Sequence, residues 1–192
     1  MHLVAERLGE LPLEIGEPSY HEFLEKYEEF EEYTSFLRTF YEELTTVTPG
    51  EPAVPFTLPD PDGNLVSMSD FSGKYVLLDF WASWCIPCLN EFPDMKRIYE
   101  NTSREEFEIV AISTEEDSLV WRQALEKFDN PWVQVYGGNG FEQETFREYK
   151  GGGIPFYILI NPEGNIERYN DIRATYNLES VLDSLFTHNP PD

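Results

Sequence analysis

Hydrophobic and polar residues alternate along this chain with two different periods. From residue 18 to 47, aromatic and aliphatic residues recur in steps of three and four, which predicts an amphipathic helix. From residue 50 onward, short apolar runs alternate with helical patterns. The change falls near Pro49 and Gly50, so we expect a helical extension over residues 1–48 and a main domain over residues 49–192.

Strands that alternate with helices are expected in the main domain. The nearly continuous apolar runs at 74–82 and 107–113 predict central strands that are covered on both faces. The remaining expected elements are a hairpin at 56–58 and 64–68, helices at 86–100, 117–128, 141–150 and 177–186, and strands at 132–136, 151–160 and 166–170. This order predicts an α/β fold with a central mixed β-sheet flanked by helices and preceded by a β-hairpin.

The predicted helix at residues 18–47 has an unusually aromatic face. Such a face should not remain in water. Three interpretations stay open: packing against the main domain, self-association or partner binding through residues 18–47, and the remnant of a larger upstream domain.

The chain is strongly acidic, with 37 Asp and Glu against 13 Lys and Arg in 192 residues and a formal charge of −24. A field of this sign repels nucleic acid and anionic lipid, so both are excluded as partners. The longest apolar runs are too short to cross a bilayer, so the chain as given is not expected to span a membrane. The first residues lack the pattern of a signal peptide, which leaves a cytoplasmic location open.

Cys85 and Cys88 are the two cysteines of the chain, and they lie three residues apart. A bridge over so short a loop stabilises a fold only weakly. A structural zinc site needs four ligands, and the three histidines, His2, His21 and His188, lie far from the pair in sequence. We therefore expect no metal and interpret the pair as a redox-active dithiol that needs no other cofactor.

The position of the pair, at the start of the helix predicted at 86–100, suggests different properties for the two sulfurs. Cys85 at the first position of the helix would meet free N–H groups and the positive end of the helix dipole, which favours its thiolate. Cys88, one turn later, would face inward and wait as a thiol. Pro87 suits the first turn, where its missing N–H costs nothing. Cys85 would attack a substrate disulfide and Cys88 would resolve the mixed disulfide.

Cys88 must lose a proton before it can attack, and Asp79 is the candidate general base. This acid interrupts an apolar strand, so burial should raise its pKa toward neutrality. The alternative is an ordinary solvated acid at the edge of a sheet. Of the two tryptophans beside the pair, we expect Trp81 to lie in the core and Trp84 to shape the substrate surface.

Four sequence features together resemble a known family. They are the leading segment "GEPAVPFTLPDPDGNLVSMSDFSGKYVLLDFWA", the motif "WCIPC", the following "NEFP" with Glu91 and Pro93, and the later "GGGIPFYILINPEGNI". The chain resembles the thioredoxin-like TlpA/ResA-type thiol–disulfide oxidoreductases of the AhpC/TSA–redoxin superfamily over roughly residues 50–187. The resemblance implies a thioredoxin-like fold, leaving the N-terminal helix as an addition.

This resemblance also implies site residues beyond the cysteines. Ile154–Pro155 would be a cis peptide packed against the pair, with the Ile154 backbone open to an extended substrate segment. Together with Trp84, the intervening Ile86 and Pro87 would contact substrate. Glu91 and Pro93 would support the site, and Pro93 would kink its helix.

Protein disulfides or dithiols are the implied substrates, with an upstream electron donor and action as a reductant. Relatives exported from the cytoplasm favour a periplasmic or other extracytoplasmic location. Three alternatives remain: a peroxiredoxin-like peroxidase, a copper-handling thioredoxin-fold module and a non-catalytic interaction domain. The first lacks its expected Thr three residues before Cys85, where Ala82 stands. The second would require wider cysteine spacing.

Overall fold

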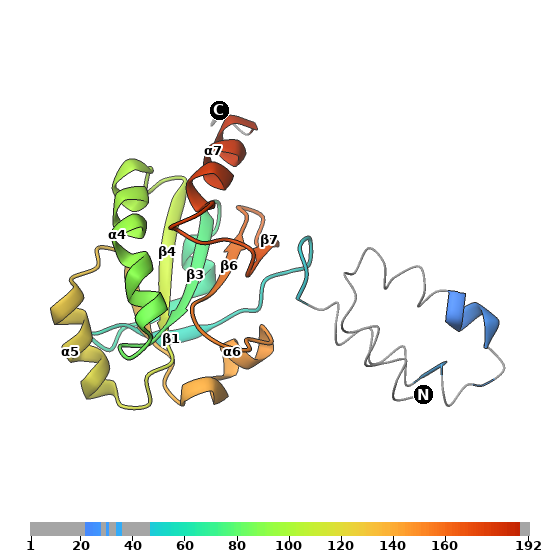
Figure 1. Cartoon of the computed structure of the whole chain (residues 1–192), viewed down its shortest axis with the longest axis horizontal. Helices are drawn as coiled ribbons and strands as arrows, with labels where there is room; N and C mark the ends of the chain where they lie inside the picture. Colours follow the sequence, from blue (N-terminus) through green and yellow to red (C-terminus); the bar gives the residue numbers. More distant parts are fainter. Residues whose placement is uncertain (1–21, 28–29, 31–33, 36–46, 189–192) are drawn as a thin grey trace. The chain divides into compact units, whose positions relative to one another are not determined.

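The computed structural model describes residues 22–27, 30, 34–35 and 47–188 (Figure 1). The chain divides into two compact units, Met1–Thr46 and Val47–Asp192. Within the first unit, residues 22–26 are helical. The rest of the aromatic helix expected over residues 18–47 lies mostly outside the described residues. Its packing, its self-association and the domain boundary expected after residue 48 therefore remain predictions.

A mixed five-stranded sheet forms the centre of the second unit, as the sequence predicts. Its strands lie in the order β5-β4-β3-β6-β7, and β3 runs parallel to β4 and antiparallel to β6. Their bounds are β3 Tyr75–Trp81, β4 Phe107–Ser113, β5 Val133–Tyr136, β6 Phe156–Ile160 and β7 Ile166–Tyr169. Strands β3, β4 and β6 are buried at every position, because apolar layers cover both faces of the sheet.

Different elements cover the two faces. The helices are α4 (Ile86–Asn101), α5 (Ser118–Phe128), α6 (Glu144–Glu148) and α7 (Leu178–His188). Side chains of α4, α5 and α7 share one hydrophobic cluster with Leu77 and Trp81 of β3. Val76, Leu78 and Phe80 face the other cluster, to which α6 and the hairpin contribute. Since successive strand residues point to opposite faces, position 79 faces the side of α4.

The N-terminal hairpin pairs β1 (Thr57–Pro59) with β2 (Leu65–Ser67) in antiparallel register. A 3₁₀ turn, η1 (Met68–Phe71), follows it, and the side chain of Asp70 accepts a hydrogen bond from the Ser67 N–H at 2.8 Å. This hairpin agrees with the expected one to within a residue or two at each strand.

Two expected elements differ from the structure. The strand expected from residue 151 begins only at Phe156, directly after Pro155, whose ring nitrogen has no hydrogen to donate to a neighbouring strand. The helix expected at 141–150 is broken into a 3₁₀ turn, η2 (Gly140–Glu142), and the short α6. Gln143 separates them, since its side chain accepts a hydrogen bond from the Phe146 N–H at 2.6 Å and caps a new helix.

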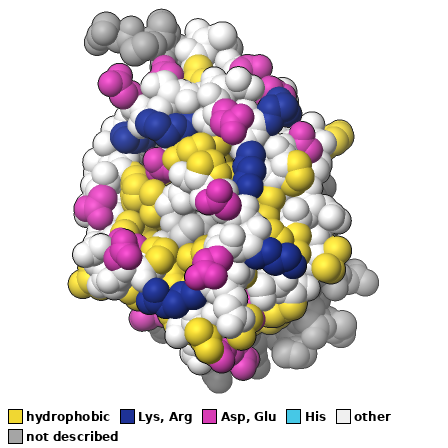
Figure 2. Space-filling model, turned by 90° about the vertical axis from the view of Figure 1, so that its left-hand side faces the viewer, with side chains coloured by type: hydrophobic (Ala, Val, Ile, Leu, Met, Phe, Trp, Pro, Cys, Tyr) yellow, Lys and Arg dark blue, Asp and Glu magenta, His cyan; other side chains and the backbone are white. Residues whose placement is uncertain are grey.

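Figure 2 shows the face of the second unit on the side of α4 and α5. Acidic and basic side chains are interspersed there around hydrophobic ones, so the excess of acid does not make this face uniformly negative. Within the described part of the chain, none of the helices combines the length and apolar character needed to cross a membrane.

Candidate active site

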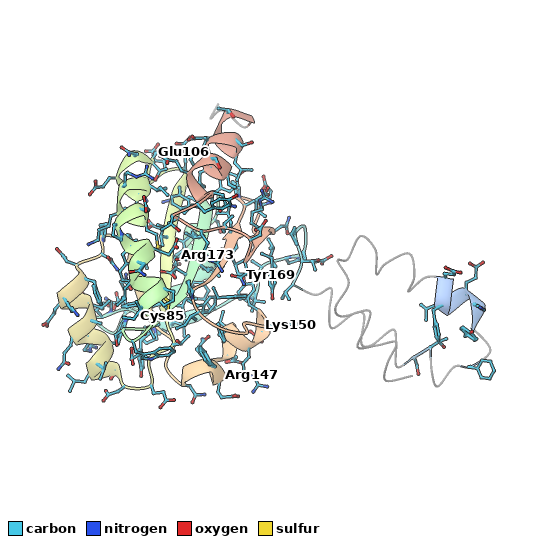
Figure 3. The ribbon with its side chains drawn as sticks, in the orientation of Figure 1. Cys85, Glu106, Arg147, Lys150, Tyr169 and Arg173 are labelled. Atoms are coloured by element: carbon cyan, nitrogen blue, oxygen red, sulfur yellow. A yellow bond between two sulfur atoms is a disulfide. The ribbon has the colours of Figure 1, made fainter. Side chains whose placement is uncertain are left out.

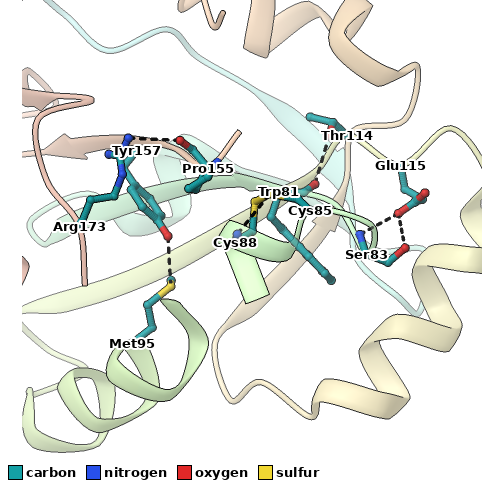
Figure 4. Close-up of a disulfide and its surroundings, with 10 residues drawn as sticks. All are labelled: Trp81, Ser83, Cys85, Cys88, Met95, Thr114, Glu115, Pro155, Tyr157 and Arg173. Carbon is teal, nitrogen blue, oxygen red and sulfur yellow. Dashed lines mark hydrogen bonds between the residues drawn. A yellow bond between two sulfur atoms is a disulfide. The ribbon is translucent and has the colours of Figure 1, made fainter. Parts of the chain in front are cut away.

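The two cysteines lie where β3 ends and α4 begins (Figure 3). They form a disulfide with an S–S distance of 2.00 Å. The sequence predicts Cys85 as the first residue of the helix, but it is the N-cap of α4, one position earlier. Pro87 occupies the first turn. The N–H of Cys88 donates a hydrogen bond to the sulfur of Cys85 at 3.2 Å (Figure 4). A free amide at the start of the helix therefore points at this sulfur.

Exposure differs sharply between the disulfide and the residues around it. Cys85 and Cys88 keep 3% and 0% of their surface accessible, so both are buried in this oxidised state. Trp84, Ile86 and Pro87 are exposed. The three side chains expected to contact substrate are thus exposed beside the buried cysteines in the sequence, while their role stays a prediction.

Trp81 lies in the core, with none of its surface accessible. Its ring packs edge-on against Phe92 at 5.3 Å between centroids. Its carbonyl accepts a hydrogen bond from the Thr114 N–H at 2.9 Å, which ties the end of β3 to the segment after β4. Trp81 therefore anchors the strand end from which the active-site loop departs.

Ile154 and Pro155 enter the site from the segment before β6. The peptide bond between them is cis. Ile154 packs against the hydrophobic cluster that contains both cysteines. The carbonyl of Pro155 accepts a hydrogen bond from Arg173 at 3.5 Å (Figure 4). This segment thus borders the same core region as the disulfide.

Asp79 is completely buried in β3 between its strand neighbours Ala111 and Tyr157. Neither carboxyl oxygen has a hydrogen-bond partner among the residues that the structure describes. Burial raises the pKa of Asp79 to about 8, the negative charge of Glu91 adds to the rise, and the guanidinium of Arg173 partly opposes it. The alternative of a solvated edge acid is wrong, because β3 is the central strand of the sheet.

Glu91, in the second turn of α4, is a buried carboxylate with clear partners. It accepts hydrogen bonds from the Thr175 N–H at 3.0 Å and the Thr175 hydroxyl at 2.7 Å. Pro93 lies inside the same helix, and its ring nitrogen has no hydrogen to donate to the preceding turn. The kink expected there remains a prediction.

Sequence reasoning missed Arg173 and Thr175, which lie in the segment between β7 and α7. Arg173 lies over the ring of Tyr157, with its guanidinium carbon 5.3 Å from the ring centroid. The hydroxyl of Tyr157 in turn points to the sulfur of Met95 at 3.6 Å. One loop thus supplies contacts to the Pro155 segment and to Glu91. The sequence carries no motif that could have identified this loop.

A second missed contact fixes the loop before the disulfide. Glu115 is buried, and one of its carboxylate oxygens accepts hydrogen bonds from the N–H of Ser83 at 2.9 Å and from its hydroxyl at 2.8 Å (Figure 4). In the sequence, Glu115 belongs to an acidic run and looks like a surface residue. Its contact crosses 32 residues, so no local pattern indicates it.

The arrangement suits thiol chemistry. The Cys85 sulfur accepts a hydrogen bond from a backbone N–H at the start of α4, and Cys88 is fully buried. The Asp79 carboxyl, whose pKa is raised, faces the side of the sheet that α4 covers. Among the residues that the structure describes, no group of three or more His, Cys, Asp or Glu is arranged to hold a metal ion.

Comparisons with known proteins show what this chain is similar to. Residues 49–172 match the model of the AhpC/TSA family. The thiol-disulfide oxidoreductase ResA of Oceanobacillus iheyensis is 37% identical over 106 residues, which are 55% of this chain and 54% of that protein. ResA of Geobacillus kaustophilus is 31% identical over 129 residues, covering 67% of this chain and 72% of the relative.

A solved structure shows the same fold. The thioredoxin domain of a thiol-disulfide oxidoreductase from Bacteroides vulgatus superposes with a TM-score of 0.66 at 32% identity, covering 72% of this chain and 97% of that domain. The chain therefore belongs to the AhpC/TSA family, and within it to the thioredoxin-fold thiol–disulfide oxidoreductases of the ResA type.

Proposed function

We propose that this protein reduces disulfides in protein substrates through the Cys85–Cys88 pair. The observation that carries the proposal is the hydrogen bond from the Cys88 N–H to the Cys85 sulfur at the start of α4. In the reduced protein this amide and the positive end of the helix would stabilise a Cys85 thiolate. Cys85 is therefore the nucleophile.

The reaction runs in two exchange steps. The Cys85 thiolate attacks a substrate disulfide, forms a mixed disulfide and releases the first substrate sulfur as a thiolate. Cys88 then attacks the Cys85 sulfur, closes the protein disulfide and releases the second substrate sulfur. Two electrons pass from the protein dithiol to the substrate, so no further cofactor is needed. An upstream electron donor must then reduce the pair again.

Asp79 serves the second step as a general base. Full burial keeps Cys88 from passing its proton directly to water, and the pKa of Asp79, raised by its burial to about 8, suits proton transfer near neutral pH.

A trapping experiment tests the assignment of the two sulfurs. Reduced Cys88→Ser protein should accumulate mixed disulfides with substrate proteins on Cys85, since the resolving sulfur is gone. The Cys85→Ser protein is the matched control and should trap little. Equal trapping by both variants would show that the nucleophile is wrongly assigned.

A redox titration against glutathione tests the direction. A reductant should have a potential at or below the glutathione poise of about −220 to −260 mV, whereas a strong oxidant lies near −120 mV. A value near the latter would contradict the proposed direction. An extracytoplasmic location, as the family resemblance suggests, belongs to the same proposal, and the identity of trapped substrates would test it.

A further inference from the structure

Three loops meet beside the disulfide, and they follow strands that are neighbours in the sheet. Strands β3, β4 and β5 are parallel and adjacent, so their carboxyl ends lie along one edge. The segments after them, residues 83–86, 115–117 and 137–142, therefore lie side by side. Such an edge is a usual place for ligands in open α/β sheets.

Contacts between the loops confirm this arrangement. Ser83 of the first loop is bonded to Glu115 of the second. The hydroxyl of Tyr136, at the end of β5, donates a hydrogen bond to the Glu116 carbonyl at 2.8 Å. A Cβ built on Gly140 would lie 3.1 Å from a carboxylate oxygen of Glu116. The second and third loops are therefore in direct contact.

Large apolar side chains project from the first and third loops. Trp84, Ile86 and Phe141 expose 56%, 63% and 47% of their surface. The rings of Trp84 and Phe141 meet edge to face, 6.1 Å apart. Phe141 also stacks on the buried Phe146 at 5.4 Å, which fixes its orientation. Exposed aromatic side chains held in this way are typical centres of binding surfaces.

Acidic side chains border these aromatic residues. Glu116 and Asp117 on the second loop and Glu142 on the third are all exposed. The pKa of Tyr136 is raised, first by burial and then by the negative charges of Asp117, Glu115 and Glu116. Glu142 is paired with Arg147 at 2.9 Å, so the acids relevant to a partner are Glu116 and Asp117. A positively charged partner is thus favoured here.

We propose that Trp84, Ile86 and Phe141, bordered by Glu116 and Asp117, form a docking surface for substrate segments that carry basic residues next to an apolar residue and a disulfide-bonded cysteine. This inference rests on the proposed function and specifies its substrate class. The apolar residue packs on the aromatic pair, the basic residues face the acids, and the substrate sulfur comes within reach of Cys85.

Two synthetic peptides test the proposal with the intact protein. They share one leucine and one cysteine activated as its 2-pyridyl disulfide, and they differ only in two flanking residues, which are lysines or glutamates. Reduced protein converts each disulfide into a free peptide thiol and 2-thiopyridone, whose absorbance gives the rate constant. The lysine peptide should react roughly three- to tenfold faster at low salt, and the difference should shrink as salt rises.

Matched variants locate the effect. Phe141→Ala should lower the rate constant for the lysine peptide by about tenfold, while Leu65→Ala, which removes an exposed side chain of the hairpin, should not. Glu116→Lys should abolish the preference for lysine, whereas Glu105→Lys, after α4, should leave it intact. Each rate constant is divided by the rate constant for alkylation of Cys85 by iodoacetamide, which needs no docking, so that changes in the reactivity of the thiolate itself are removed.

The outcomes separate the two proposals. If both peptides react at equal rates with the wild-type protein, the docking surface is refuted while disulfide exchange stands. If neither peptide reacts although Cys85 is alkylated, the proposed function itself fails. A loss of activity in Phe141→Ala that Leu65→Ala shares would also count against the docking surface.

Discussion

Replacing Asp79 by Asn should make the protein more stable at neutral pH and nearly unchanged in stability in acid. Burial raises the pKa of Asp79 from its ordinary 3.8 to about 8. Between these values the folded protein holds a proton that the unfolded chain has lost. Stability therefore falls as pH rises from about 4, and the full cost is present above about pH 8. Asn has the size of the protonated acid and cannot ionise, so it removes this cost.

The two pKa values set the expected magnitude. Each pH unit between them is worth about 1.4 kcal/mol. Relative to the Asp79→Asn variant, the wild-type protein should lose roughly 4 kcal/mol of unfolding free energy by pH 7 and roughly 6 kcal/mol above pH 8. These values are upper limits, because local opening around an ionised carboxylate reduces its cost.

Denaturant unfolding of both oxidised proteins from pH 4 to 9 measures the effect. The difference between their unfolding free energies should be near zero at pH 4 and should grow steadily up to about pH 8. Asp62→Asn, at an exposed position of the hairpin turn, is the control and should show no such trend. Parallel pH curves for wild type and Asp79→Asn would refute the view that burial raises the pKa of this carboxyl to about 8 in the folded protein.

Two further substitutions test the surroundings of the site. Gly151→Ala should destabilise the fold by about 1–3 kcal/mol, because a Cβ there would lie 2.3 Å from the Phe146 ring. Gly152→Ala is the control: its Cβ meets nothing within 4 Å, so the midpoint of thermal unfolding should change little. Similar losses in both variants would contradict this packing. Arg173→Gln should raise the pKa of Asp79, since Arg173 lowers it, and should move the pH midpoint of mixed-disulfide resolution upward, by stopped-flow measurement. An unchanged midpoint would argue against Asp79 as the base.

Local patterns were enough to predict the framework of the site. The apolar run around Leu77 and Leu78 predicts a strand covered on both faces, and β3 is such a strand. The helical pattern at residues 86–100 predicts α4, whose buried side includes Phe92 and Met95. These predictions succeeded because the burial of each residue follows from its immediate neighbours in sequence.

Contacts between distant segments could not be predicted in this way. Glu115 and Thr175 reach their partners across 32 and 84 residues of sequence. A carboxylate in an acidic run and a threonine in a loop are both ordinary surface residues until the fold brings a donor or acceptor to them. The break at Gln143 was missed for a related reason, since one side-chain cap outweighs the helical pattern around it.

The most direct test of the account is the pH dependence of alkylation of the two cysteines in the reduced protein. Mass spectrometry after brief exposure to iodoacetamide can follow each cysteine separately. The account predicts that Cys85 reacts with a pKa well below the value of about 8.5 for free cysteine, while Cys88 stays largely unmodified until the protein unfolds. Equal reactivity of the two, with the pKa of an ordinary cysteine, would contradict it.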